Sequence, residues 1–314
     1  MNVPNGQLSL KPSRKRKLWT YLKGHYELYL FLIPGLVFAA MFKLLPMSKI
    51  VIAFQQFKPL KGIDGSAWVG LGQFEKMLAD PQVWQVVRNT LEINLLQVLV
   101  CIPLPMILAV MLNEIGCLPV KKSIQTIIYV PHFFTWVIVY SIFYIIFGSA
   151  GIVNNLVRSL GGQGVLFFMQ GGWFRFLLVL SAAWKGAGWG TIVYLSAIAA
   201  IDSEIYEAAI IDGASKMQQI RRITLPCLAP TMVLMLTIRL GSVLSGGFDQ
   251  VLVFYNPTVY DTADILSTYV YRMGIGQANF SYAAAVGLFE SVVGLAFVLC
   301  SNFLSKRLCG RTVW

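Results

Sequence analysis

Apolar residues along this chain gather into six long stretches. They cover residues 28–54, 89–112, 124–147, 173–201, 228–252 and 282–304. A helix needs about 20 apolar residues to cross the hydrocarbon core of a bilayer, and each stretch reaches that length. Several contain proline or glycine, which a membrane bundle tolerates because neighbouring helices satisfy the freed backbone groups. The pattern therefore predicts six membrane-spanning helices.

Composition agrees with this prediction. The 314 residues are 57% hydrophobic and 12% charged, with a mean hydropathy of +0.67. A soluble domain carries about 25% charged residues. The first apolar stretch follows a basic segment and lacks a small-residue cleavage site, so we expect an uncleaved first helix. The predicted fold class is an all-α polytopic membrane protein.

The net charge of +11 is distributed as a topology signal. Six Lys and Arg residues precede the first span and three follow the last, and with two connecting loops that side holds fourteen, against six on the other. Basic residues are retained in the cytoplasm. We therefore expect a cytoplasmic segment at 1–27, a six-span domain at 28–304 with a cytoplasmic loop at 202–226, and a cytoplasmic tail at 305–314. No nucleic-acid-binding motif accompanies the charge, so nucleic acid is not an expected partner.

Residues that carry catalysis or bind metals are scarce. The chain has two histidines, and its five cysteines form no CxxC pair, which argues against a metal cluster or a disulfide framework. It also has no GxxxxGK[ST] motif for nucleotide phosphates. We expect no catalytic site and no bound cofactor. The loops opposite the cytoplasm are too short for a folded recognition domain, although one short helix is expected after Leu71.

The cytoplasmic loop has the pattern of two short helices. Asp202 is suited to cap the first helix, and Gly213 is placed to end it in a left-handed conformation. Ser215 and Gln218 then have the spacing of a capping box for the second helix. We expect Pro226 to stop that helix. On these features alone, the loop could be a simple connection between spans or a docking element.

The same loop resembles the EAA loop of ABC importer permeases. The matching residues are Glu207, Ala208, Ala209, Asp212, Gly213, Ala214, Ile223, Leu225 and Pro226. YVP in the third stretch, the W-x-G-x-G-W pattern in the fourth and LSTYVYRMGI at 266–275 resemble the carbohydrate-uptake branch, which includes the maltose and oligosaccharide permeases. The resemblance implies the type I ABC importer permease fold, with a coupling helix at 207–214 that sits in a cleft of a cytoplasmic ATPase.

The resemblance also implies a set of partners. The first partner is a second homologous permease, and the family favours a different chain in that role. Two cytoplasmic ABC ATPase subunits bind the ATP and magnesium. The last partner is an extracellular solute-binding protein. The implied cargo is a sugar or oligosaccharide, and the implied location is a bacterial cell membrane, in contact with lipid. The competing interpretation is a stand-alone secondary transporter or channel that uses intramembrane charges, but it does not account for the EAA pattern.

Charged residues inside the spans indicate functional positions, because they are costly in a bilayer. Lys185 and Arg239 lie well inside the fourth and fifth stretches, on either side of the cytoplasmic loop. Two hypotheses remain open. The cations pair internally with Asp249 or Glu290, or they meet an oligosaccharide that carries uronate groups.

Lys185 belongs to WKGAGWG (184–190), where indoles that can stack on sugar faces alternate with glycines that permit close approach. By resemblance, this segment and the region at 239–246 line the translocation cavity of sugar permeases, and part of the third span occupies a comparable region. The predicted substrate-pathway residues are Thr135, Trp136, Trp184, Lys185, Gly186, Trp189, Arg239, Ser242, Val243 and Gly246.

Overall fold

The computed structural model describes residues 24–241, 243–244 and 246–309, with the side chains of 301 and 304–309 left aside. Most of the predicted basic N-terminal segment, Ser242 and the end of the predicted tail lie outside the described residues. The chain divides into two compact units, Met1–Ile52 and Ala53–Trp314. Among the described residues, six helices are long and apolar enough to cross a membrane. The prediction of six spans is confirmed.

From residue 24 on, the first unit forms one helical span. It consists of α2 (Tyr26–Ala39), the π-helical turn η1 (Ala40–Leu44), α3 (Leu45–Met47) and most of the 3-10 segment η2 (Ser48–Phe54). Its side chains are exposed along nearly the whole length of α2 and α3. Such an apolar, exposed surface is what a lipid bilayer or a neighbouring membrane helix covers.

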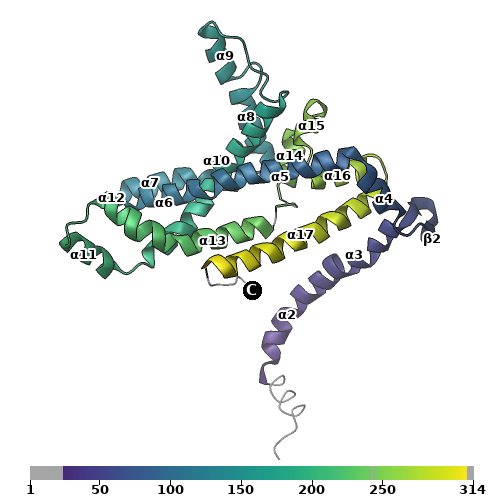
Figure 1. Ribbon diagram of the computed structural model, residues 1–314, viewed down its shortest axis with the longest axis horizontal. Coiled ribbons are helices and arrows are strands. Elements are labelled where there is room, and N and C mark those ends of the chain that lie inside the picture. Colours follow the sequence, from purple (N-terminus) through teal and green to yellow (C-terminus); the bar gives the residue numbers. More distant parts are fainter. Residues whose placement is uncertain (1–23, 242, 245, 310–314) are drawn as a thin grey trace, which may run out of the picture. The chain divides into compact units, whose positions relative to one another are not determined.

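The second unit is a helical bundle with α10 at its centre. Its spans are α5 (Pro81–Cys101) continued by α6 (Pro103–Asn113), α8 (Trp136–Phe147), α10 (Gly171–Ala199), α13 (Leu225–Gly241) and α17 (Phe280–Cys309). Helix α10 packs along α5 and α6, while α13 packs along α17 (Figure 1). The core around α10 includes the fully buried side chains of Phe174, Leu177 and Leu178.

Two glycines of WKGAGWG explain how α10 approaches its neighbours. A Cβ at Gly188 would lie 2.3 Å from the carbonyl oxygen of Ile128, and one at Gly190 would lie 2.7 Å from the Cβ of Pro105. Any larger residue would therefore push α10 away from these two elements. In contrast, a Cβ at Gly186 would meet nothing within 4 Å among the described residues. Two of the three glycines thus serve close helix packing.

The third apolar stretch is not the single helix expected over 124–147. Helix α7 (Leu118–Tyr129) ends in the 3-10 turn η4 (Val130–Phe133), and Phe134 is extended before α8 begins. Pro131 lies in this turn, where it has no N–H to donate to a continuous helical ladder. The fifth stretch is also shorter than expected, because α13 ends at Gly241 and α14 (Phe248–Phe254) begins after Gly247, which has a φ of +89°.

Pro226 does not stop the second helix of the cytoplasmic loop, so this prediction was wrong. Helix α12 (Lys216–Gln219) continues through the π-helical turn η5 (Ile220–Thr224) into α13. The π-helical turn just before the proline shifts the backbone hydrogen bonds by one residue. Pro226 then lies in the first turn of α13, where its missing N–H is tolerated. The helix therefore runs without a break into the membrane span.

Short elements connect the spans. The helix expected after Leu71 is confirmed as α4 (Gly72–Ala79), and it is preceded by a β-hairpin that the sequence did not predict. The hairpin pairs β1 (Gln55–Lys58) with β2 (Gly62–Trp68) across the turn η3 (Pro59–Lys61). The remaining elements are α9 (Ile152–Ser159), α11 (Ser203–Ile211), η6 (Pro257–Val259), α15 (Tyr260–Ala263), α16 (Leu266–Tyr271) and η7 (Arg272–Gly276).

Candidate functional site

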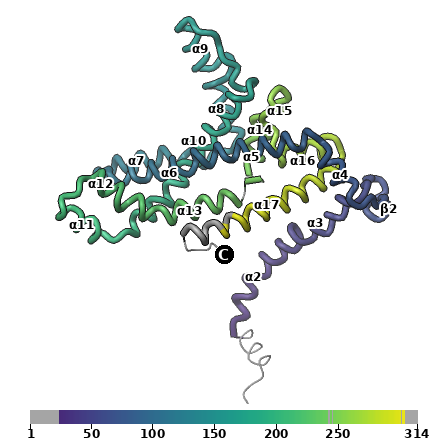
Figure 2. Tube along the Cα trace, viewed as in Figure 1, coloured from purple at the N-terminus to yellow at the C-terminus, as the bar shows by residue number. Residues whose placement is uncertain are grey.

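The cytoplasmic loop predicted from the sequence forms the expected pair of helices, α11 and α12, at one end of the bundle (Figure 2). The Asp202 carboxylate accepts from the backbone N–H of Glu204 at 3.0 Å. Gly213 ends α11 with a φ of +76°. The capping box is present, because Ser215 and Gln218 each accept from the other's backbone N–H, at 3.4 and 2.7 Å.

The surface of α11 is open to solvent. Glu207, Ala208, Asp212 and Gly213 are exposed, while Ala209 and Ala214 are half-buried. The helix also presents large apolar side chains, with Ile211 86% exposed. A short capped helix that combines an acidic residue, small residues and exposed isoleucine has the composition of a docking surface.

Two contacts tie this helix pair to the spans. The hydroxyls of Tyr206 in α11 and Thr224 in η5 share a hydrogen bond of 2.9 Å. Lys216 of α12 forms an exposed ion pair with Glu114, at the end of α6, over 3.4 Å. A displacement of α11 therefore reaches the base of α13 directly, through a half-buried hydrogen bond.

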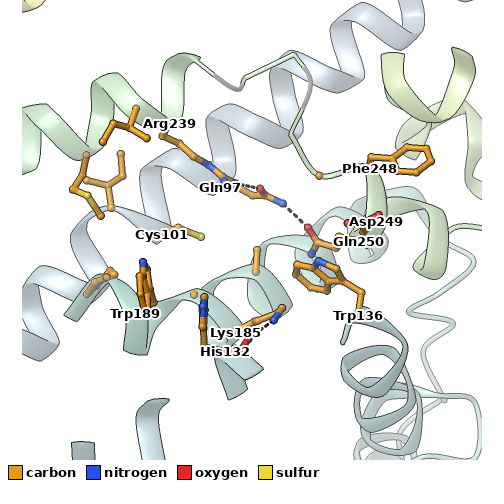
Figure 3. Close-up of a pocket in the computed structure, with 18 of the residues that line it drawn as sticks. Gln97, Cys101, His132, Trp136, Lys185, Trp189, Arg239, Phe248, Asp249 and Gln250 are labelled. Atoms are coloured by element: carbon orange, nitrogen blue, oxygen red, sulfur yellow. Dashed lines mark hydrogen bonds between the residues drawn. The ribbon is translucent and has the colours of Figure 1, made fainter. Parts of the chain in front are cut away.

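A cavity of about 550 Å³ lies between α5, α10, α13 and α14 (Figure 3). Five of the predicted substrate-pathway residues line it: Trp136, Lys185, Gly186, Trp189 and Arg239. Gln97, Cys101, His132, Tyr194, Asp249 and Gln250 also line it, and the sequence analysis did not place these residues there.

The other described candidates lie elsewhere. Thr135 caps α8, accepting from the backbone N–H of Ile138 at 3.5 Å. Trp184 packs against aromatic rings of the third stretch, and Val243 is buried in a second apolar core. Gly246 lies in the turn before α14.

Lys185 is held by backbone carbonyls. Its Nζ donates to the carbonyl oxygens of His132 at 2.6 Å and of Phe134 at 2.7 Å, and lies 5.6 Å from the ring centroid of Trp136. These carbonyls belong to the interruption between α7 and α8, so Lys185 satisfies groups that a continuous helix would have paired. The Lys185 ammonium thus stabilises the interruption between α7 and α8, and Lys185 also lines the cavity.

Arg239 enters the cavity from α13 and contacts a neutral partner. Its Nη2 donates to Oε1 of Gln97 on α5 over 2.5 Å. On the opposite wall, the imidazole of His132 stacks on the indole of Trp189, with centroids 5.0 Å apart and planes 12° apart. The cavity therefore presents cationic donors, one carboxylate from Asp249 and flat aromatic faces.

A second polar cluster orders the segment between α14 and α17. Asp264 is 1% exposed, accepts from Thr268 Oγ1 at 2.7 Å and forms an ion pair with Arg272. Burial raises the pKa of Asp264, against the opposing effect of the hydrogen bonds from Thr268 and Arg272. The Arg272 guanidinium also lies 4.8 Å from the ring centroid of Tyr260. These contacts stabilise the fold of this segment, because Thr268 and Arg272 enclose the Asp264 carboxylate.

Six spans, a capped helix pair tied to them and a polar, aromatic cavity define the transmembrane subunit of a transporter. Residues 101–311 match the family described as binding-protein-dependent transport system inner membrane component. The chain is 44% identical over 287 residues to protein LplB of Bacillus subtilis (strain 168), covering 91% of this chain and 90% of that protein.

Two further proteins are similar to this chain over nearly its whole length. The polygalacturonan/rhamnogalacturonan transport system permease protein YteP of Bacillus subtilis (strain 168) is 41% identical over 298 residues, which covers 95% of this chain and 92% of that protein. A chain in a crystal structure of a bacterial alginate ABC transporter, in complex with an alginate pentasaccharide-bound periplasmic protein, is 38% identical. It superposes with a TM-score of 0.86 over 95% of this chain and 100% of that chain.

This chain belongs to the binding-protein-dependent transport system inner membrane component family. It is a multi-pass inner membrane protein and the permease component of an ABC importer, and its relatives include permeases for sugars and oligosaccharides. The family, the fold class and the permease function predicted from the sequence are confirmed. The family decides against the alternative of a stand-alone secondary transporter or channel.

Proposed function

We propose that this permease forms one half of the pathway of an ATP-driven importer for acidic oligosaccharides that carry uronate groups. The observation that carries the proposal is the cavity, whose lining combines Arg239 with the aromatic residues Trp136, Trp189 and Phe248. The cargo of two similar proteins supports it, since YteP belongs to a polygalacturonan/rhamnogalacturonan transport system and the superposed chain to an alginate transporter.

The chemistry of the cavity fits such a cargo. Guanidinium binds carboxylate through parallel hydrogen bonds, which makes arginine the preferred residue for recognising that group. The indole of Trp189, 55% exposed, offers a flat apolar face to the C–H face of a sugar ring. Charge recognition by Arg239 and stacking on Trp189 together suit a polar, charged ring better than a neutral apolar solute.

The helix pair at 202–219 is the proposed coupling element. The exposed surface of α11, with Glu207, Ala208 and Asp212, would dock into a cytoplasmic ATPase subunit, and the Tyr206–Thr224 hydrogen bond would pass the movement to α13. Both termini would then be cytoplasmic, as the basic residues predict. One chain has one such element, so two ATPase subunits require a second permease, which we propose is a different chain, and a solute-binding protein delivers the cargo outside.

The test is uptake into proteoliposomes that contain this chain, the second permease, both ATPase subunits and the binding protein. Trigalacturonate and its trimethyl ester are compared, because they share the same sugar chain and the ester has no carboxylate charge. We expect ATP-dependent uptake of the acid, and uptake of the ester about tenfold slower, as loss of one charge-assisted hydrogen bond implies. Uptake that proceeds equally without ATP would refute the importer mechanism, and equal rates for acid and ester would refute the acidic cargo.

A further inference from the structure

A series of side-chain hydrogen bonds runs along the cavity wall and connects four helices. Arg239 of α13 donates to Gln97 Oε1 of α5 at 2.5 Å, and Gln97 Nε2 donates to Gln250 Oε1 of α14 at 3.0 Å (Figure 3). Gln250 Nε2 in turn donates to the Leu178 carbonyl of α10 at 2.6 Å and to Ser181 Oγ at 2.8 Å. The two amides connect a cavity cation to the backbone of the central helix.

The groups at the two ends of this series determine how the amides of Gln97 and Gln250 are oriented. A guanidinium has only donors, so the amide oxygen of Gln97 must face Arg239. The Leu178 carbonyl can only accept, so the amide nitrogen of Gln250 must face α10. These two constraints leave the nitrogen of Gln97 opposite the oxygen of Gln250, which is a matched pair. Because Gln97 and Gln250 are 2% and 1% exposed, a flipped amide would leave buried groups unsatisfied.

Gln97 therefore presents a neutral acceptor to Arg239 and a donor to Gln250. The contact orients the guanidinium without cancelling its positive charge. A carboxylate at the same position would orient the guanidinium just as well, but it would neutralise the charge and would face Gln250 with an acceptor instead of a donor. The choice of amide over carboxylate at position 97 thus controls how much positive charge the cavity offers.

We propose, resting on the acidic cargo inferred above, that Gln97 is a positioning residue that sets the charge selectivity of the cavity. It holds the guanidinium of Arg239 where a uronate carboxylate binds and places no negative charge beside that guanidinium. Gln250 acts behind it by fixing the orientation of the Gln97 amide. Neither glutamine belongs to the short motifs YVP, W-x-G-x-G-W and LSTYVYRMGI.

The test measures equilibrium binding of trigalacturonate and of its trimethyl ester to the complete membrane complex in nanodiscs, without the binding protein, by microscale thermophoresis. Gln97→Glu keeps the acceptor toward Arg239 and adds a negative charge. We expect it to weaken binding of the acid about tenfold and to leave the ester unchanged. Gln97→Met removes the hydrogen bonds without adding charge, and we expect the acid to bind about fivefold more weakly.

The matched control is Gln82→Glu, which adds the same charge to the same helix ~22 Å away and should keep the wild-type ratio of the two affinities. If both Gln97 variants keep that ratio while Arg239→Gln loses it, the role of Gln97 is overturned and the acidic cargo stands. If the wild-type complex binds acid and ester equally, both proposals are overturned. A loss of both ligands together with a lower unfolding temperature would show a purely structural role and also overturn the role of Gln97.

Discussion

Gly213 ends helix α11 in a left-handed conformation, with a φ of +76°. A Cβ at this position would meet nothing within 4 Å among the described residues, so backbone conformation, and not space, selects glycine. We expect Gly213→Leu to abolish ATP-driven uptake while membrane insertion continues, because a strain of about 1–2 kcal/mol would shift the end of the proposed coupling helix. Uptake by proteoliposomes and the yield of membrane-inserted chain measure the two effects.

Gly116 provides the matched control for this prediction. It also lies in an exposed loop of open surroundings, but it has no left-handed φ. Gly116→Leu should therefore transport at the wild-type rate. Normal transport by Gly213→Leu, or an equal loss in both variants, would show that the geometry of α11 is not what couples the permease.

Single residues were predictable where they carry an unusual signal. Arg239 and Lys185 stood out as cations inside apolar stretches, and Trp189 as an indole between glycines. Gln97 and Gln250 gave no such signal, because an amide inside a span is compatible with many environments. Their roles depend on hydrogen bonds between residues 142 and 153 positions apart, which no local pattern contains.

At the scale of whole elements, the interruption between α7 and α8 depends on a side chain from another helix. Lys185 of α10 donates to the carbonyls of His132 and Phe134 at 2.6 and 2.7 Å. We expect Lys185→Met to remove this donor and destabilise the complex by about 1 kcal/mol, because two half-buried carbonyls lose their partner. The midpoint of thermal unfolding of the purified complex would fall accordingly.

Lys122→Met tests whether this loss is specific. Lys122 is exposed on α7, so removing its ammonium should leave the unfolding midpoint unchanged. A similar midpoint for both variants would mean that the two carbonyls find other donors and that Lys185 does not stabilise the turn.

The two prolines show why helix breaks were harder to predict than helices. Apolar length was enough to predict all six spans. Pro131 lies in a true interruption, whereas Pro226 lies within a continuous helix. The difference is that Lys185 satisfies the carbonyls around Pro131 from another helix, while the π-helical turn before Pro226 absorbs the missing N–H locally. The residues next to each proline reveal neither the donor from another helix nor the π-helical turn.

For the molecule as a whole, the cavity and the coupling element are properties of the assembled bundle. The cavity draws its walls from α5, α10, α13 and α14, and α13 begins at the turn that Tyr206 contacts. Movement of α11 would therefore reach the helix that carries Arg239. We propose that this continuity couples ATP hydrolysis elsewhere to a change at the cavity.

The most direct test of the central claim is uptake by an Arg239→Gln importer relative to wild type, for trigalacturonate and for its trimethyl ester. Arg158→Gln, which removes an exposed guanidinium from α9, is the control. We predict that Arg239→Gln lowers uptake of the acid about tenfold and leaves that of the ester unchanged, while the control alters neither. Equal effects of Arg239→Gln on acid and ester, or no effect on either, would contradict an acidic cargo recognised by this cavity.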